Sequence, residues 1–323
     1  MGKTRIFELK TGRSRLVTST VPDETRDIVF LANGNARMGR AGAEEAKAAL
    51  EEEGYIVKDF LVTTSEKELL KHLDEHLAKG EKLIAIGGGD GTLRSAAEKL
   101  AGTDTTMAVV PLGTGNAWAR ELGIPPGPAN TARAVANGRV KTIDLGIANG
   151  RGFVNVATMG LTALINKNLE KRGKGLFGRL AYFPAVLRSI TQLRPFTLHV
   201  KTPNEEHHVR ALMFVAAAGR THAGPFQVTR AAANDDGLLS LYALDHTGRG
   251  GLFRFGLMLL LRRHTDLDEV WTCECTSAEV TTRPTKHVIV DGEKAGRTPL
   301  VLGIRAASLK VLVPEEEGMK DEG

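Results

Sequence analysis

The chain has 323 residues, of which 42% are hydrophobic and 25% are charged, which is an ordinary composition for a soluble protein with well-packed cores. Its formal net charge of +5 is mild and its basic residues are dispersed, so the charge does not require a nucleic-acid partner. A mild positive charge would equally suit binding of ATP or of an anionic membrane surface. The two cysteines, Cys273 and Cys275, lack the further ligands of a zinc site and predict reduced thiols. The N-terminus has no apolar segment typical of a secretory signal, and the longest apolar window, 251–261, is shorter than the about 20 residues that cross a bilayer.

Strand-like and helix-like segments alternate in the first half of the chain. After an N-terminal extension over residues 1–26, buried strands are expected over 27–32, 55–62, 82–86 and 106–111. Helices are expected over 41–53, from a capping box at Ser65 to Gly80, over 92–100 and over 117–122. This alternation predicts a parallel sheet in an α/β domain.

After about Val140 the pattern changes to shorter apolar runs with more frequent turns. Strands are expected over 196–201, 209–217, 238–244, 270–281, 287–290 and 308–313, followed by an acidic tail. Helices are expected over 179–193 and 252–264. The second helix could touch a membrane, but apolar residues on all its faces favour burial. The sequence therefore predicts a second, mostly β domain.

The glycine-rich segment GGGDGT, residues 87–92, follows the apolar run of the third expected strand. Ligands of parallel α/β sheets bind at the carboxyl ends of the strands. Glycines there let a phosphate approach the backbone N–H groups, and the start of the following helix adds a positive dipole end. Gly87, Gly88, Gly89 and Gly91 therefore suit a nucleotide phosphate, whereas Asp90 suits a hydroxyl or a magnesium-bound water, and Thr92 a helix cap or a phosphate.

Two further turns follow strands in the same way. One is PLGTGN, residues 111–116, and the other covers residues 33–39 after the first strand. Each turn alone is weak evidence, but three of them at the same expected edge of one sheet predict a nucleotide site.

Several nucleotide-binding classes are excluded. The chain has no G-x-x-x-x-G-K-[S/T] segment, no G-x-G-x-x-G after the first strand, and none of the H-R-D and D-F-G motifs of protein kinases.

Acidic residues also occur in glycine turns of the second half. Asp236 precedes Gly237, and the segment Asp291, Gly292, Glu293 follows an expected strand. An Asp-Gly pair is a common hairpin turn, which is the interpretation we favour for Asp291. Glu293 is less typical of a turn and is a candidate general base. Phosphoryl transfer to an alcohol needs phosphate donors, Mg²⁺ and such a carboxylate.

Five segments in this order resemble the diacylglycerol kinase catalytic-domain family, a group of lipid kinases that includes sphingosine and ceramide kinases. GGGDGT at 87–92 is similar to the family's G-G-D-G-T, residues 111–116 to its P-x-G-T-x-N, and residues 144–146 to its D-x-G. Residues 234–239 are similar to its D-G-x-L and residues 290–293 to its D-G-E, so that the resemblance spans about 27–314.

The resemblance implies an α/β plus β fold. An NAD-kinase-like α/β domain over 27–145 binds ATP, and a β-sandwich domain over 146–304 binds the lipid. The last strand, in the segment 305–323, returns to the first domain.

The resemblance also implies site residues. ATP contacts are expected from three loops and one threonine: Asn33, Gly34, Asn35, Ala36, Arg37, Thr64, Gly87, Gly88, Gly89, Asp90, Gly91, Thr92, Leu93, Arg94, Gly113, Thr114, Gly115 and Asn116. A magnesium site is expected at Asp236 with the carbonyls of Ala233 and Leu238. Glu293 is the expected proton acceptor, and Asp90 and Asp144 belong to the same acidic network.

Two departures from the family pattern leave the acceptor lipid open. Gly34 stands where the family usually has proline, and Ala117 stands where many bacterial diacylglycerol kinases have aspartate. Family members with alanine at that place include sphingoid-base kinases. Diacylglycerol and a sphingoid or ceramide lipid both stay open as acceptors. An NAD kinase and a non-catalytic nucleotide- or lipid-binding relative are the alternatives. An NAD kinase shares G-G-D-G-T, but residues 234–239 and 290–293 match lipid kinases better. A non-catalytic relative would not need the acidic residues that this chain retains.

A lipid kinase implies a lipid substrate and transient contact with a membrane surface. We therefore expect a cytoplasmic protein at the membrane periphery, with no nucleic-acid partner and with a homodimer left open.

Overall fold

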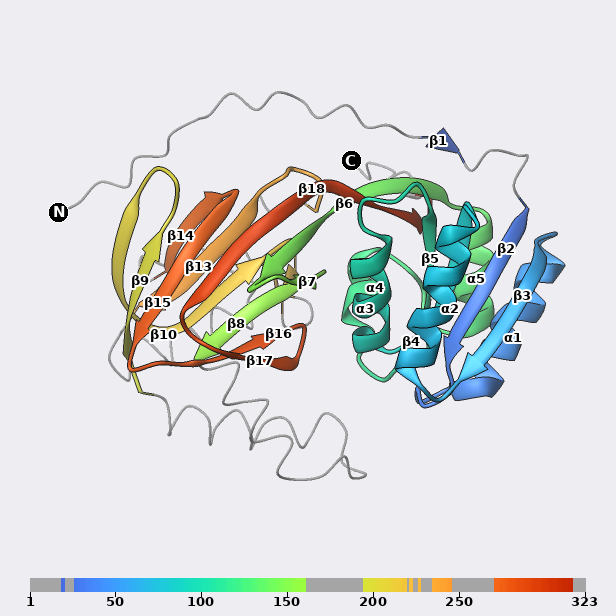
Figure 1. Cartoon of the computed structure of the whole chain (residues 1–323), viewed down its shortest axis with the longest axis horizontal. Helices are drawn as coiled ribbons and strands as arrows, with labels where there is room; N and C mark the ends of the chain where they lie inside the picture. Colours follow the sequence, from blue (N-terminus) through green and yellow to red (C-terminus); the bar gives the residue numbers. More distant parts are fainter. Residues whose placement is uncertain are drawn as a thin grey trace, which may run out of the picture.

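The computed structural model of the chain describes residues 19–20, 26–160, 194–219, 221–222, 226–227, 234–245 and 270–315. The described strands form an α/β domain and an all-β domain joined through one continuous sheet (Figure 1). The helices expected over 179–193 and 252–264 lie outside the described residues, as do Ala233, most of the N-terminal extension and the acidic tail.

The first domain alternates strands and helices as expected. Its elements are β2 (Asp27–Asn33), α1 (Gly39–Glu52), β3 (Ile56–Thr63), α2 (Glu66–Ala78), β4 (Leu83–Gly88), α3 (Asp90–Leu100), β5 (Thr106–Pro111), α4 (Ala117–Glu121) and α5 (Pro128–Ala136). Strands β3, β2, β4 and β5 pair in parallel in that order.

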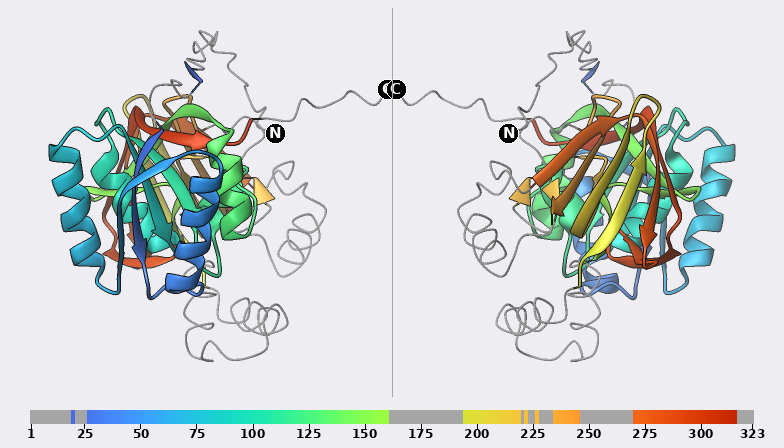
Figure 2. Two further views of the ribbon diagram at one scale, coloured as in Figure 1. Left: turned by 90° about the vertical axis from the view of Figure 1, so that its right-hand side faces the viewer. Right: turned by 90° about the vertical axis from the view of Figure 1, so that its left-hand side faces the viewer.

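Helices cover both faces of this parallel sheet (Figure 2). One core packs residues of α2, α3 and α4 against the strands, and another packs residues of α1 and α5 against the opposite face. Because both faces are covered, the strands are nearly continuous apolar runs, as in β2, where residues 28–32 are fully buried. This is why their positions were predictable from the sequence.

The helix after β3 begins at the expected cap. Ser65 precedes α2, and its hydroxyl oxygen accepts a hydrogen bond from the Glu68 N–H at 3.3 Å. The Glu68 carboxylate, however, accepts from the Thr63 hydroxyl, so that only half of a capping box forms.

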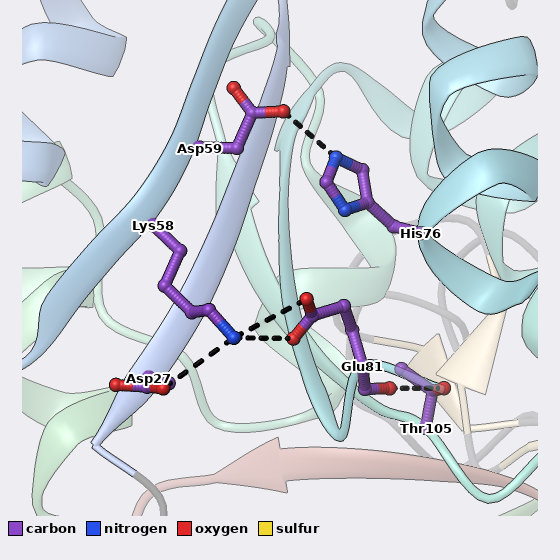
Figure 3. Close-up of polar contacts among 6 residues, drawn as sticks. All are labelled: Asp27, Lys58, Asp59, His76, Glu81 and Thr105. Carbon is purple, nitrogen blue, oxygen red and sulfur yellow. Dashed lines mark hydrogen bonds and ion pairs between the residues drawn. The ribbon is translucent and has the colours of Figure 1, made fainter. Parts of the chain in front are cut away.

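Polar contacts link the edge strand β3 to its neighbours (Figure 3). The Lys58 ammonium lies 3.5 Å from an Asp27 carboxylate oxygen and 3.4 Å from Glu81. His76 of α2 pairs with Asp59 at 2.8 Å. The Thr105 hydroxyl donates to the Glu81 carbonyl at 2.7 Å. These contacts tie α2 and the segments that precede β4 and β5 to the edge of the sheet.

The described part of the second domain is all β. Its elements are β6 (Arg139–Ala148), β7 (Arg151–Phe153), β8 (Val156–Gly160), β9 (Phe196–Lys201), β10 (Glu206–Ala217), β11 (Thr221–His222), β12 (Phe226–Gln227), β13 (Leu239–Asp245), β14 (Val270–Cys275), β15 (Ser277–Arg283), β16 (His287–Val290), β17 (Glu293–Arg297) and β18 (Leu300–Val313). The short strand β1 (Ser19–Thr20) pairs with β6.

Strand β18 belongs to both domains. Its first part pairs with β15, its last part pairs in parallel with β5, and β6 runs antiparallel along most of its length. The expected return of the last strand to the first domain is therefore confirmed, although β18 starts at Leu300 and is longer than the expected 308–313. The expected domain boundaries, at 145 and 304, fall inside β6 and β18.

Some elements had no counterpart among the expected ones: α5, β1, β6, β7, β8, β11, β12 and β17. The sequence of β17 resembles a basic turn, and in the structure its side chains are mostly exposed.

Within the part of the chain that the structure describes, no helix has the length and apolar character needed to cross a bilayer.

Substitutions at two positions of the shared strand β18 should change the free energy of unfolding by very different amounts. Leu309 is fully buried in the core of the first domain, whereas Val301 is 56% exposed. Leu309→Ala should lower the free energy of unfolding by about 2–5 kcal/mol through the lost burial and the cavity. The matched change Val301→Ala should stay within about 0.5 kcal/mol of the wild type. Urea unfolding measures both, and equal losses would contradict the central position of β18.

Candidate active site

The predicted loops lie at one edge of the parallel sheet. Strands β2, β3, β4 and β5 end at Asn33, Thr63, Gly88 and Pro111, and each is followed by a segment that the sequence marked as a candidate. This is the edge at which open parallel sheets bind ligands.

The loop after β2 is fastened to its neighbours through side-chain amides. Asn33 Nδ2 donates to Thr92 Oγ1 at 2.9 Å, and Asn33 Oδ1 accepts from the Asn35 N–H at 2.9 Å. Asn35 Nδ2 donates to the Thr64 carbonyl at 2.7 Å. Asn33, Asn35, Thr64 and Thr92 therefore come together. Arg37, in the same loop, is exposed.

Helix α3 begins at Asp90, two residues before its expected start. Residues 90–92 therefore form the first turn, where backbone N–H groups lack intrahelical partners. Gly87 and Gly88 have a second reason to be glycine. A Cβ on Gly87 would lie 2.9 Å from the Ala32 Cβ, and one on Gly88 would lie 2.7 Å from the Thr92 Cβ. Both glycines allow close packing beneath the loop.

The second glycine loop packs directly against the first. A Cβ on Gly113 would lie 2.7 Å from the Gly89 Cα, so the two backbones touch. The Asp90 carboxylate accepts weakly from the Trp118 N–H, at 3.4 Å, and its Oδ2 would lie 2.8 Å from a Cβ on Gly115. Asp90 thus joins the starts of α3 and α4.

Asn116 holds the second loop in shape. It has a left-handed backbone, with φ of 48°, and its amide both accepts from the Gly113 N–H and donates to the Gly113 carbonyl, each at 3.1 Å. Thr114, at the tip of this loop, is exposed.

The two residues after the glycine loop have different surroundings. The Leu93 side chain is fully buried in the core of the first domain. Arg94 is 5% exposed and turns toward the second domain.

Glu293 of the second domain reaches the glycine loop of the first. Its Oε1 would lie 2.8 Å from a Cβ on Gly91, and its Oε2 lies 3.3 Å from Arg94 Nη2. Its Oε2 also forms an ion pair with Arg151 Nη2. The structure therefore brings the candidate phosphate loop and the candidate base into contact.

Asp291 fixes the hairpin that carries Glu293. It adopts a φ of 45° and is followed by Gly292 at 87°, which forms the tight turn between β16 and β17. Its carboxylate also accepts from the N–H groups of Val154, Asn155 and Val156, at 2.8, 3.0 and 2.9 Å. Burial raises the pKa of Asp291 to about 6, against the opposite effects of these three donors and of Arg94. The residue is a structural anchor as well as a turn former.

Asp144 organises the second acidic turn. Its carboxylate oxygens accept from the Gly237 and Ala307 N–H groups, each at 2.7 Å. Burial raises the pKa of Asp144, the two backbone donors oppose this rise, and the charges of Asp236 and Asp235 add to it. Because both oxygens are engaged, Asp144 positions the turn that contains Asp236.

Asp236 is exposed, and its Oδ1 accepts from the Leu238 N–H at 2.9 Å. The contacts of this turn run to β6: the Gly237 N–H donates to Asp144, and Asp235 pairs with Lys141 at 3.1 Å. Among the residues that the structure describes, no three His, Cys, Asp or Glu side chains converge to hold a metal ion. A carboxylate with backbone carbonyls is still an all-oxygen donor set, which suits Mg²⁺.

Sequence reasoning missed Arg151 and the anchoring role of Asp291. Neither has a local signal that could have revealed it, because the partners of Arg151 and Asp291 lie more than a hundred residues away.

Comparisons with known proteins agree with this architecture. The family model described as "Diacylglycerol kinase catalytic domain" matches residues 27–148, and the one described as "YegS C-terminal NAD kinase beta sandwich-like domain" matches residues 155–313. The expected order of an α/β domain and an NAD-kinase-like β-sandwich is therefore confirmed.

Relatives and a solved structure are similar to this chain. A diacylglycerol kinase of Mycobacterium tuberculosis is 33% identical over 245 residues, which cover 74% of this chain and 79% of that protein. A "Probable lipid kinase YegS-like" protein of Pseudomonas aeruginosa is 32% identical over 209 residues, covering 64% and 69%. The crystal structure of a putative diacylglycerol kinase from Bacillus anthracis superposes with a TM-score of 0.77 at 22% identity, over 90% of this chain and 98% of that one. The chain belongs to the diacylglycerol kinase catalytic-domain family.

Proposed function

We propose that this protein is an ATP- and Mg²⁺-dependent lipid kinase that phosphorylates the hydroxyl group of a lipid such as diacylglycerol or a sphingoid or ceramide lipid. The observation that carries the proposal is the contact of Glu293 with Gly91. It places a carboxylate next to a loop suited to phosphates, and phosphoryl transfer to an alcohol needs both in one place.

The donor nucleotide would lie along the edge formed by the three loops. The phosphates would approach the backbone near Gly89, Gly91 and Gly113, which have no side chains of their own, and the first turn of α3 offers N–H groups. Asn33 and Thr64 would bound the nucleotide on the side of β2 and β3.

In the reaction, the lipid oxygen forms a bond to the γ-phosphorus as the bond to the bridging oxygen breaks. The electron pair of that bond stays on ADP, and the hydroxyl proton goes to the Glu293 carboxylate. Asp90, whose carboxylate links the start of α3 to the start of α4, would orient the hydroxyl.

Magnesium, when bound, neutralises charge on the phosphates. Asp236 would hold it with the Leu238 carbonyl, and Asp144 would keep that turn in place through Gly237.

The acceptor requires access to a lipid surface, so we infer transient membrane contact. Transfer of labelled γ-phosphate from ATP, with Mg²⁺, to diacylglycerol, monoacylglycerol, ceramide, a sphingoid base or NAD tests the function. We expect label in one lipid. Label in NAD alone, or in no acceptor while ATP still binds, would refute the lipid kinase assignment.

Glu293→Gln should lower turnover by roughly 10²–10⁴-fold, the usual contribution of a general base. The matched control is Glu279→Gln, an exposed glutamate on β15, which should keep wild-type turnover. Steady-state kinetics with the best lipid acceptor measures both, and comparable turnover in Glu293→Gln would remove this residue from the role of base.

Asp236→Asn should raise the Mg²⁺ concentration for half-maximal activity by roughly tenfold or more, because the proposed ligand loses its negative charge. The control is Asp74→Asn, which makes the same chemical change at a carboxylate on α2 that pairs with Lys99 at 2.7 Å. An unchanged metal titration in Asp236→Asn would exclude Asp236 as a ligand.

Gly113→Ala should weaken ATP binding, since a Cβ would lie 2.7 Å from the Gly89 backbone and force the two loops apart. Gly303→Ala, where a Cβ would meet nothing within 4 Å, should bind ATP like the wild type. Calorimetric titration compares them. Equal affinities would show that the packing of the loops does not shape the nucleotide site.

A further inference from the structure

Arg151 lies at the site because of a tight hairpin. Strands β6 and β7 are joined by Asn149 and Gly150, with φ of 51° and 81°, and Arg151 pairs with Ala148 directly after the turn. Strand β7 packs against α3, because a Cβ on Gly152 would lie 3.1 Å from the Glu98 Cγ. Arg151 thus stands between α3 of the first domain and β17 of the second.

Two arginines from different domains share one carboxylate oxygen. Arg94 Nη2 lies 3.3 Å from Glu293 Oε2, and Arg151 Nη2 forms an ion pair with the same atom. The other oxygen, Oε1, lies over Gly91 in the first turn of α3. The Glu293 carboxylate therefore occupies a place with two positive charges and a helix start, which suits any anionic group with several oxygens.

Arg94 has a donor left over. Its side chain is only 6% exposed, with Glu98 at 3.6 Å and the Ser95 hydroxyl at 3.1 Å from its terminal nitrogens. Its Nε is buried and has no hydrogen-bond partner in the described residues. A buried guanidinium with an unsatisfied donor is costly, and a further acceptor oxygen at this point would remove the cost.

Glu293 Oε2 is occupied while it is held in this way, because two guanidinium groups donate to it. For this oxygen to contact an acceptor hydroxyl, the arginines must engage another anion. Guanidinium groups bind phosphate oxygens with the same geometry as carboxylate oxygens.

We propose that Arg94 and Arg151 form a seat for the transferred phosphoryl group, which Glu293 fills in this structure. In the reaction, the γ-phosphoryl oxygens replace Glu293 on the two arginines, and the released carboxylate accepts the hydroxyl proton of the acceptor. Arg151 is thereby a further residue that binds and positions the phosphoryl group. This inference rests on the proposed kinase function.

The seat makes a prediction about binding alone, without any lipid. ATP carries the γ-phosphoryl group and ADP does not, so only ATP should compete with Glu293. Calorimetric titration of the full chain with each nucleotide and Mg²⁺ gives both dissociation constants. In Arg151→Gln the affinity for ATP should fall about tenfold, the usual loss for one charged hydrogen bond, while that for ADP stays constant. Arg151→Lys should lose less, because it keeps the charge.

The affinity for ATP should rise when Glu293, which competes for the arginines, is weakened. Glu293→Gln should bind ATP several-fold more tightly than the wild type and leave ADP unchanged, since an uncharged amide holds the arginines less well. The control is Arg133→Gln, which removes another arginine paired with a glutamate, at 3.2 Å from Glu52 on the far side of the first domain. It should leave both constants unchanged. A merely structural role of Arg151 would lower the melting temperature and shift ATP and ADP alike.

The proposed kinase function and the phosphoryl seat can be refuted separately. If the wild type binds no ATP or labels no lipid, the proposed function fails. If the wild type binds ATP and labels a lipid, but the ratio of ATP to ADP affinity is the same in the wild type, Arg151→Gln and Glu293→Gln, the seat is refuted while the kinase remains.

Discussion

The pairing of β18 with strands of both domains is the constraint on which the site depends. Its first part is hydrogen-bonded to β15 in the β domain and its last part to β5 in the α/β domain, with β6 alongside both. Two domains joined only by a linker would be free to move relative to each other. Here one continuous sheet holds them, so that a side chain of β17 can meet the first turn of α3. The apolar residues of β18 reinforce this by entering the cores of both domains.

Neighbouring acidic residues have distinct tasks in this arrangement. Asp291 gives its carboxylate to three backbone N–H groups and so fixes the turn, whereas Glu293, two residues later, is left to face the glycine loop. Asp144 is likewise committed to backbone donors, which leaves Asp236 exposed at the turn that Asp144 holds. In both pairs one carboxylate is committed to backbone N–H groups and shapes the backbone, whereas the other is exposed. Burial decides the division, because a buried carboxylate must be hydrogen-bonded.

The sequence predicted what depends on local pattern and missed what depends on distant contact. Strand β5 was found residue for residue, since buried parallel strands are apolar runs. Strand β17 was missed because its residues are mostly polar and exposed, and β18 was shortened because Gly303, Arg305 and Ala307 do not look like strand. The glycine loops were recognised as a site, but the packing of Gly87 on Ala32 and the pairing of Arg151 with Glu293 follow from the assembled fold.

We propose that the α/β domain and the β domain supply one catalytic unit at the contact of α3 with β17. A double-mutant cycle between Asp90→Asn and Glu293→Gln, read as kcat/KM for the best lipid acceptor, tests it most directly. Residues that act as a unit give strongly non-additive losses. The account predicts that the double variant is little worse than the poorer single variant. Losses that multiply would show that the two carboxylates act independently and would contradict a shared site.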